Sequence, residues 1–284
     1  MAGSRLRRTI TDPVSGEQVE VPGANGHGSG HFLSRLRSYL FTDLVIFAWT
    51  AICGAISLTG SFFDRDGSFQ HAMAKLWSRG ILAVSFTPVT VENPERLVGP
   101  CVVAANHISA FDIPVLYTHL PMQFRIVANK PLFKIPFVGW HLRRSGQIPI
   151  DRSTMKTTIK TLHVAVEDLK QGLSVVIFPE GGRSPSGRID KFMNGAFYVA
   201  IKAQAPVLPV AIVGTYEVLP MNTFHIMPRP LLMRAGEPIP TAGLTLRDVD
   251  TLADRVKAVI EEMYYEKSGV TRPRKIAEPV AHEL

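Results

Sequence analysis

Short apolar runs and amphipathic stretches alternate along most of the chain after Pro88. The apolar runs predict buried strands near residues 101–105, 123–128, 146–150, 174–178 and 207–213. Apolar residues at helical spacing predict helices between them, near 110–119, 132–143, 154–170 and 194–203. A late strand within 231–239 and a closing helix over 246–267 complete the pattern. This alternation predicts an α/β domain over 88–268, a mixed sheet flanked by helices.

An apolar stretch precedes this domain at residues 39–63. Its uncharged part, 44–58, would form roughly 22 Å of helix, short of the roughly 30 Å hydrocarbon core of a bilayer. Asp43 limits the stretch at one end and an Asp-Arg-Asp-Gly turn limits it at the other. We therefore expect a helix that is partly embedded in a membrane, in preference to one that spans it.

The next stretch, 69–86, is amphipathic. His71, Lys75 and Arg79 recur every fourth residue, and apolar residues occupy the other face, which predicts a helix at a membrane surface. The two segments would form a membrane-associated helical hairpin over 31–87. The alternative is that both helices merely pack on the α/β domain.

The chain ends have a different composition. Residues 1–30 contain arginine, proline and glycine without periodicity and predict a disordered basic tail that is not a signal peptide. Residues 269–284 are polar and predict a flexible tail. Arg35 and Arg37 precede the first helix, so positive charge favours a cytosolic N-terminus, with the hairpin returning the domain to the cytosolic face of the cytoplasmic membrane.

Charge and apolarity both point to lipid. Hydrophobic residues make up 46% of the 284 residues and charged residues only 19%. The net charge is +7, and the window 125–160 alone holds eight Lys or Arg residues against one acidic residue, Asp151. Such a patch suits an anionic membrane, a phosphorylated substrate or an acidic carrier, or is simply a solvated face. No nucleic-acid-binding signature accompanies it, and Cys53 and Cys101 predict buried thiols in a reducing cytoplasm.

The run at 101–105 leads into a histidine that is followed five positions later by an aspartate. A strand that ends there places His107 at the carboxyl edge of the sheet, where open α/β folds bind their ligands. Asp112 would hold one ring nitrogen and leave the other to take a proton from a hydroxyl or water. Alternatively, Ser109 caps the next helix, Asp112 completes a capping box, and His107 is a satisfied polar residue.

The run at 174–178 leads into a second polar loop, Pro179-Glu180-Gly181-Gly182-Arg183-Ser184. Its glycines allow backbone amides to approach an anion, and the planar fork of Arg183 can bind two phosphate oxygens. The alternative is an ordinary turn with a solvated arginine. A serine hydrolase lacks support because there is no Gly-x-Ser-x-Gly elbow, and a nucleotide-binding loop lacks the Gly-Lys-Ser/Thr that it requires.

The Asn-His-x4-Asp block at 106–112 and the Phe-Pro-Glu-Gly-x-Arg-Ser block at 178–184 together resemble the 1-acylglycerol-3-phosphate acyltransferase family. Two further family blocks are recognisable at 130–152 and 205–212, and the resemblance covers about residues 70–240. Three positions depart from the family pattern and bear on the acceptor: Gly182 replaces the usual Thr, Pro131 the usual Glu, and Met193 a common Lys.

The resemblance implies a membrane-associated 1-acyl-sn-glycerol-3-phosphate O-acyltransferase of phospholipid biosynthesis. A fatty acyl group would pass from acyl-CoA or acyl carrier protein to lysophosphatidic acid, giving phosphatidic acid. His107 would be the base and Asp112 its orienting partner. The implied substrate-binding residues are Glu180 for an acceptor hydroxyl or for Arg183, Arg183 for the phosphate, Lys130 and Arg152 for anionic groups, and Gly181, Gly182 and Ser184 in the loop.

Neither a cofactor nor a metal is expected. Alternative acceptors are glycerol-3-phosphate, another lysophospholipid or a lyso-aminolipid. The alternative from another class of protein is a catalytically silent, lipid-binding scaffold.

Overall fold

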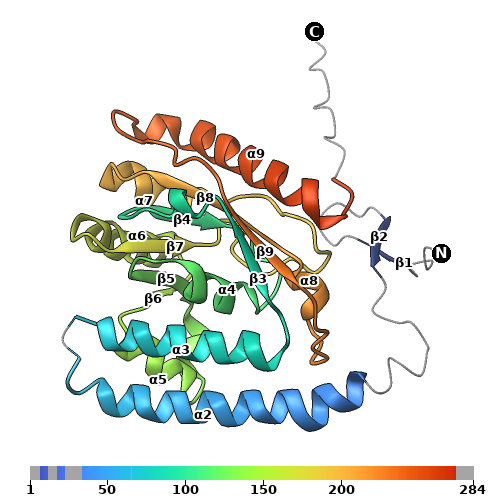
Figure 1. Cartoon of the computed structure of the whole chain (residues 1–284). Coiled ribbons are helices and arrows are strands. Elements are labelled where there is room, and N and C mark those ends of the chain that lie inside the picture. The colour runs from blue at the N-terminus through green and yellow to red at the C-terminus, as the bar shows by residue number, and fades with distance from the viewer. Residues whose placement is uncertain (1–6, 12–17, 23–33, 65, 273–284) are drawn as a thin grey trace.

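The computed structural model describes residues 7–11, 18–22, 34–64 and 66–272. A seven-stranded sheet with the order β3-β9-β8-β4-β7-β5-β6 forms its centre (Figure 1). The strands are β3 Val89–Glu92, β4 Val102–Ala105, β5 Phe124–Asn129, β6 Ile148–Ile150, β7 Ser174–Ile177, β8 Val207–Val213 and β9 Leu231–Ala235. β4 to β8 run parallel, whereas β9 pairs antiparallel with β8 and parallel with β3. The predicted mixed sheet is confirmed, with β3 as an additional edge strand.

Helices cover both faces of the sheet. In Figure 1, α6, α7 and α9 lie on one side, and α3, α4 and α5 lie on the other. Their bounds are α3 Ser68–Val84, α4 Asp112–His119, α5 Val138–Arg144, α6 Met155–Lys170, α7 Gly195–Ala203, α8 Thr215–Val218 and α9 Val249–Ser268. Short 3-10 turns occur at η2 Pro94–Arg96, η3 Lys130–Lys134 and η4 Leu246–Asp248.

The central strand β4 shows why the apolar runs are unbroken. Val102 and Ala104 belong to the core on the α6, α7 and α9 side, whereas Val103 and Ala105 belong to the core on the α3 and α4 side. All four are fully buried. Successive side chains of a strand point to opposite faces, so a sheet that is covered on both faces requires apolar residues at every position.

The first described helix is longer than expected. It is continuous over Ser34–Gly60, including a π-helical turn Ser38–Thr42 and α2 Asp43–Gly60. Asp43 therefore lies inside the helix, where its carboxylate accepts a 3.4 Å hydrogen bond from Ser38, and it does not end it. Among the described residues this is the one helix long and apolar enough to cross a membrane, with a mean hydropathy of 1.8 and 17% of that window buried.

Two residues of the expected polar stripe of α3 make contacts within the protein. His71 is buried, with its ring against Tyr117 and Phe124, and the Lys75 ammonium donates a 2.8 Å hydrogen bond to the Leu120 carbonyl. α3 packs on α4, where the chain supplies aromatic rings and a helix-end carbonyl for these polar side chains. The membrane-associated hairpin stays a prediction. α2 lies outside α3 as an outer layer (Figure 1).

Part of the N-terminal tail is ordered. β1 Arg7–Thr11 pairs antiparallel with β2 Gln18–Pro22, which corrects the expectation of disorder for these ten residues. Both segments contain β-branched residues that favour strands, such as Ile10, Val19 and Val21. The rest of residues 1–30, and the tail after Arg272, lie outside the described residues.

Candidate active site

Three neighbouring strands end at the site. β4 lies between β7 and β8 and runs parallel to both, so the loops after residues 105, 177 and 213 meet at one edge of the sheet. The Asn106 side chain extends the β4–β8 ladder past its last pair: its amide donates to the Ile212 carbonyl at 2.9 Å and accepts from the Ile212 N–H at 2.7 Å. This clamp fixes the backbone from which His107 projects.

His107 and Asp112 form a hydrogen-bonded pair. The imidazole Nδ1 lies 2.8 Å from Asp112 Oδ2, and the same oxygen accepts the backbone N–H groups of Ile108 at 2.8 Å and Ser109 at 2.9 Å. Asp112 is fully buried, whereas the His107 side chain is 18% exposed. A carboxylate only accepts, so Nδ1 carries the proton in this pair and Nε2 keeps a lone pair that can take a proton.

The capping-box alternative is half correct. Asp112 does accept the Ser109 N–H, as a capping box requires, but the Ser109 hydroxyl donates to the Leu219 carbonyl at 2.8 Å. The carboxylate therefore caps the turn and holds the imidazole at the same time. Capping and base orientation are not exclusive readings of this motif.

Phe178 fixes the plane of the imidazole. The two rings are stacked with centroids 4.0 Å apart and an angle of 20° between their planes. Phe178 follows β7 and is buried.

Glu180 supports the His107 backbone and makes no ion pair with Arg183 among the described residues. Its carboxylate accepts the His107 N–H at 2.6 Å through one oxygen and the Asp190 N–H at 2.9 Å through the other. Burial raises the pKa of this carboxyl to about 8, against an ordinary value of 4.5. The expected contact with Arg183 is therefore replaced by two backbone donors, which sequence spacing does not reveal.

This buried carboxyl predicts a pH-dependent stability. Because its folded pKa lies above its unfolded pKa, the folded chain holds the proton more tightly, and its contribution to stability declines as the pH rises from about 4.5 to about 8. We expect the difference in unfolding free energy between the parent and Glu180→Gln to fall across this window. Urea unfolding of both proteins at pH 5, 6, 7 and 8 measures this difference. A difference that stays constant with pH would contradict the prediction. The variant Glu167→Gln, at an exposed position, is the control.

The glycine loop differs from a simple anion cradle. Gly181 has φ +77°, and a Cβ there would meet Met193 and the Arg152 guanidinium. Its N–H donates to the Phe178 carbonyl at 3.0 Å, so this amide, which we expected to approach an anion, already has a hydrogen-bond partner. The Gly182 N–H makes no hydrogen bond among the described residues, and a Cβ at Gly182 would meet nothing within 4 Å.

Arg183 and Ser184 separate in role. Arg183 is exposed and makes no ion pair within the described part of the chain. Ser184 is buried: its N–H donates to the His107 carbonyl at 3.0 Å, and its hydroxyl lies 3.2 Å from that of Ser186. Ser184 therefore ties the glycine loop to the histidine turn, with no contact to the imidazole that a nucleophile needs.

Arg152 contacts the glycine loop, whereas Lys130 contacts Asp151, the neighbour of Arg152. Lys130 forms a 2.8 Å ion pair with Asp151, and this bond holds the pKa of that carboxyl well below its usual range. Arg152 donates a 2.6 Å hydrogen bond to the Gly181 carbonyl. A hollow of about 400 Å³ lies between them; it is lined by Asn129, Lys130, Pro131, Lys134, Ile150, Asp151 and Arg152.

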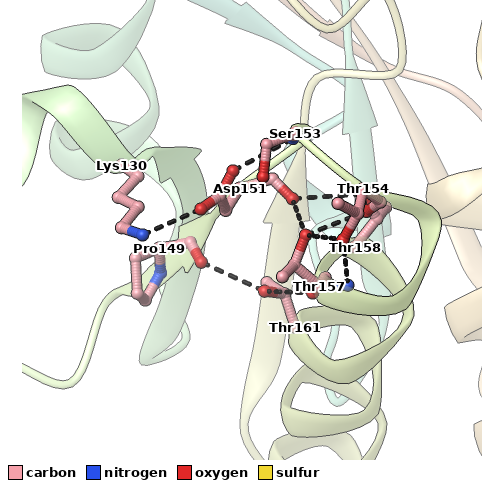
Figure 2. Close-up of polar contacts among 8 residues, drawn as sticks. All are labelled: Lys130, Pro149, Asp151, Ser153, Thr154, Thr157, Thr158 and Thr161. Carbon is pink, nitrogen blue, oxygen red and sulfur yellow. Dashed lines mark hydrogen bonds and ion pairs between the residues drawn. The ribbon is translucent and has the colours of Figure 1, made fainter.

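A set of threonines at the start of α6 forms hydrogen bonds with the end of β6 (Figure 2). The Asp151 carbonyl accepts the Thr157 hydroxyl at 3.0 Å and the Thr158 hydroxyl at 3.1 Å. Thr154 caps α6 by accepting the Thr157 N–H at 3.2 Å, and Thr161 donates to the Pro149 carbonyl at 3.1 Å. The end of β6 is thereby fixed to the start of α6, and Asp151 is held against Lys130.

Sequence reasoning missed two residues at the site, Phe178 in its stacking role and Thr215. Thr215 donates a 2.6 Å hydrogen bond to the second oxygen of Asp112. Its only signal was its position two residues after a predicted strand end. Within the described residues no group of three or more His, Cys, Asp or Glu side chains could hold a metal ion. Both cysteines are buried and free, as predicted.

Comparison with known proteins finds acyltransferases in sequence and in structure. Residues 88–213 match the family described as Acyltransferase. A chloroplast 1-acyl-sn-glycerol-3-phosphate acyltransferase of Brassica napus is 33% identical over 202 residues, 68% of this chain and 58% of that protein. A counterpart from Arabidopsis thaliana is 35% identical over 162 residues, 56% and 45% of the two proteins. The crystal structure of PlsC, the LPA acyltransferase of Thermotoga maritima, superposes with a TM-score of 0.71 at 27% identity, covering 83% of this chain and 96% of that one.

The sheet, the His-Asp pair at its edge and the match over 88–213 define an acyltransferase domain. The two curated relatives are both 1-acyl-sn-glycerol-3-phosphate acyltransferases. The chain carries an acyltransferase domain and is similar to the 1-acylglycerol-3-phosphate acyltransferases. It spans about half the length of the first two curated relatives, 58% and 45%.

Proposed function

We propose that this protein transfers a fatty acyl group from a thioester to the free hydroxyl of lysophosphatidic acid, giving phosphatidic acid. The observation that carries the proposal is the His107–Asp112 pair, with Nδ1 held at 2.8 Å and the His107 side chain still partly exposed. A base held in this way suits removal of a proton from a hydroxyl. The names of the relatives supply the substrate class.

The reaction needs one base and no acyl-enzyme. His107 Nε2 takes the hydroxyl proton while the hydroxyl oxygen attacks the thioester carbonyl carbon. The carbon–sulfur bond then breaks, and the imidazolium returns the proton to the leaving thiolate. Asp112 keeps the ring oriented and stabilises its positive charge, since a hydrogen bond strengthens when one partner becomes charged.

The surroundings suit an anionic, apolar acceptor. Arg183 is exposed beside the glycine loop, and its planar fork matches phosphate oxygens. An apolar hollow of about 130 Å³ lies between α2, α3, α4 and α5, and Ile113, the neighbour of Asp112, is part of its lining. The phosphate of the acceptor would bind at the loop, and the hollow offers apolar surface for a hydrocarbon chain.

The acyl donor is acyl-CoA or acyl carrier protein, and the protein needs no cofactor. We assign it to the cytoplasmic membrane, with the domain on the cytosolic face. Support for the membrane comes from the apolar helix Ser34–Gly60, whose exposed side chains include Leu40, Phe41, Leu44 and Phe47. An exposed apolar surface of this kind is typical of a membrane contact.

The test is acyl transfer by detergent-purified protein. We expect labelled phosphatidic acid when lysophosphatidic acid is offered with a labelled long-chain acyl-CoA. If this pair gives no product, the same assay with acyl carrier protein as donor, and with glycerol-3-phosphate and other lysolipids as acceptors, follows. Inactivity with every combination would contradict the proposal and favour the lipid-binding scaffold.

Arg183→Ala is expected to raise the KM for the phosphorylated acceptor about 10–100-fold and to leave the KM for the acyl donor nearly unchanged. The reason is the loss of charge-assisted hydrogen bonds to the phosphate. Steady-state kinetics with each substrate varied in turn measures this. Equal effects on both substrates would contradict the assigned role, and Arg255→Ala, on an exposed position of α9, is the control.

A further inference from the structure

The turn after β8 brings a buried hydroxyl to the catalytic pair. β8 pairs with β4 up to Val210 opposite Ala105, and four residues later the chain turns at Gly214, which has φ +94°. A Cβ at Gly214 would meet the Pro230 carbonyl at 3.2 Å, so the turn suits glycine for both space and conformation. Thr215 follows as the first residue of α8 and is 1% exposed.

Thr215 holds the oxygen of Asp112 that His107 does not use. Its hydroxyl donates to Asp112 Oδ1 at 2.6 Å, whereas Oδ2 accepts from His107 Nδ1 and from two backbone N–H groups. The carboxylate is fully buried, so water does not replace a lost donor cheaply. The torsion that turns a carboxylate has broad minima, and donors on both oxygens are therefore needed to fix its plane.

The turn itself is held from two sides. The Ser109 hydroxyl donates to the Leu219 carbonyl at 2.8 Å, and the Leu219 N–H donates to the Thr215 carbonyl at 3.1 Å. The histidine turn and the β8–α8 turn are thus connected twice, through Asp112 and through Ser109. The Thr215 backbone cannot shift without disturbing the segment that carries His107.

We propose that Thr215 is a positioning residue for acyl transfer: it fixes the carboxylate plane of Asp112 and thereby the imidazole of His107. The proposal rests on the proposed function. It also gives a role to the block at 205–212, which has no side chain in the chemistry. The block includes most of β8, and the Asn106 side chain joins β8 to β4 beyond their last backbone pair. The turn after β8 then places the Thr215 hydroxyl against Asp112 Oδ1.

Three variants test the proposal. Thr215→Val removes the hydroxyl at nearly constant shape, and we expect kcat to fall about 10-fold or more with KM for both substrates unchanged, because a hydrogen bond to a charged group is lost. Thr215→Ser keeps the hydroxyl and is expected to restore most of kcat. Thr241→Val is the matched control: Thr241 is equally buried, and its hydroxyl donates only to the carbonyls of Ala200 and Ala205.

The two valine variants should lose similar stability and differ in activity. Thr241→Val is expected to lower the melting temperature as Thr215→Val does, without lowering kcat. An unchanged kcat in Thr215→Val, a serine variant as slow as the valine variant, or an equal loss of kcat in Thr241→Val would each overturn the proposal.

A spectroscopic readout separates this proposal from the proposed function. The imidazole Nδ1–H of His107, hydrogen-bonded to a buried carboxylate, is expected to give a downfield proton resonance that His107→Ala lacks. Thr215→Val should move or broaden it, and Thr215→Ser should not. If the parent acylates no acceptor but this resonance responds as expected, the positioning holds and the proposed function fails; an unmoved resonance overturns the positioning itself.

Discussion

His107→Ala is expected to lower kcat about 10²–10⁴-fold, the contribution typical of a positioned general base. Alanine removes the imidazole nitrogen, Nε2, that would take the proton, so the hydroxyl would have to lose its proton to water. The KM values should change little, because the imidazole is not assigned to ground-state binding. Initial rates of phosphatidic acid formation, with both substrates varied, measure the effect.

The fold of this variant should persist. Asp112 keeps two backbone N–H donors and the Thr215 hydroxyl when the imidazole is removed, so its charge is not left without partners. Circular dichroism and the melting temperature check this. His163→Ala, at an exposed position of α6, is the control, and an active His107→Ala protein would remove the base from the mechanism.

Asp112→Asn should have the second largest effect, a fall in kcat of about 10–10²-fold, since it removes the charge that stabilises the imidazolium. The site can accept an asparagine. Its carbonyl oxygen can take the place of Oδ2, facing His107 Nδ1 and two backbone N–H groups, and its amide can donate to the Thr215 hydroxyl. The imidazole then keeps its tautomer and loses only the adjacent negative charge.

The expected signature is therefore a lower kcat with a nearly unchanged melting temperature. Asp112→Ala is the contrasting variant, because it leaves buried donors unsatisfied at a cost of about 1–3 kcal/mol each and should unfold at a lower temperature. If Asp112→Asn retained full activity, the carboxylate would act only as a cap of the turn, and the capping-box reading would suffice.

Much of the domain could be predicted from the sequence because its strands are covered on both faces. β4 and β8 consist of buried apolar residues, β7 does so after its first residue, Ser174, and the positions of all three strands agree with the expected runs. β3 was missed. It is a four-residue edge strand with a mixed burial pattern, so it lacks the apolar run that marks the central strands.

Side-chain partners were harder to predict than elements. A polar stripe on α3 indicated a surface helix, but the structure offers His71 two aromatic rings and Lys75 a helix-end carbonyl. Glu180 is near Arg183 in sequence, yet its oxygens accept from His107 and Asp190, because the loop turns back toward β4. Such contacts depend on backbone positions that periodicity does not encode.

The site draws its groups from the ends of three adjacent strands, and this has a consequence for biosynthesis. His107 is followed by Glu180 about 70 residues later, and Thr215 arrives more than 100 residues after His107. A chain emerging from a ribosome therefore contains the whole Asn-His-x4-Asp block long before the neighbouring strands exist to organise it. Non-local strand pairings of this kind form late and slowly. Base activity should appear abruptly once β8 and the turn after it have joined the sheet, and nascent chains that stop before residue 213 should be inactive.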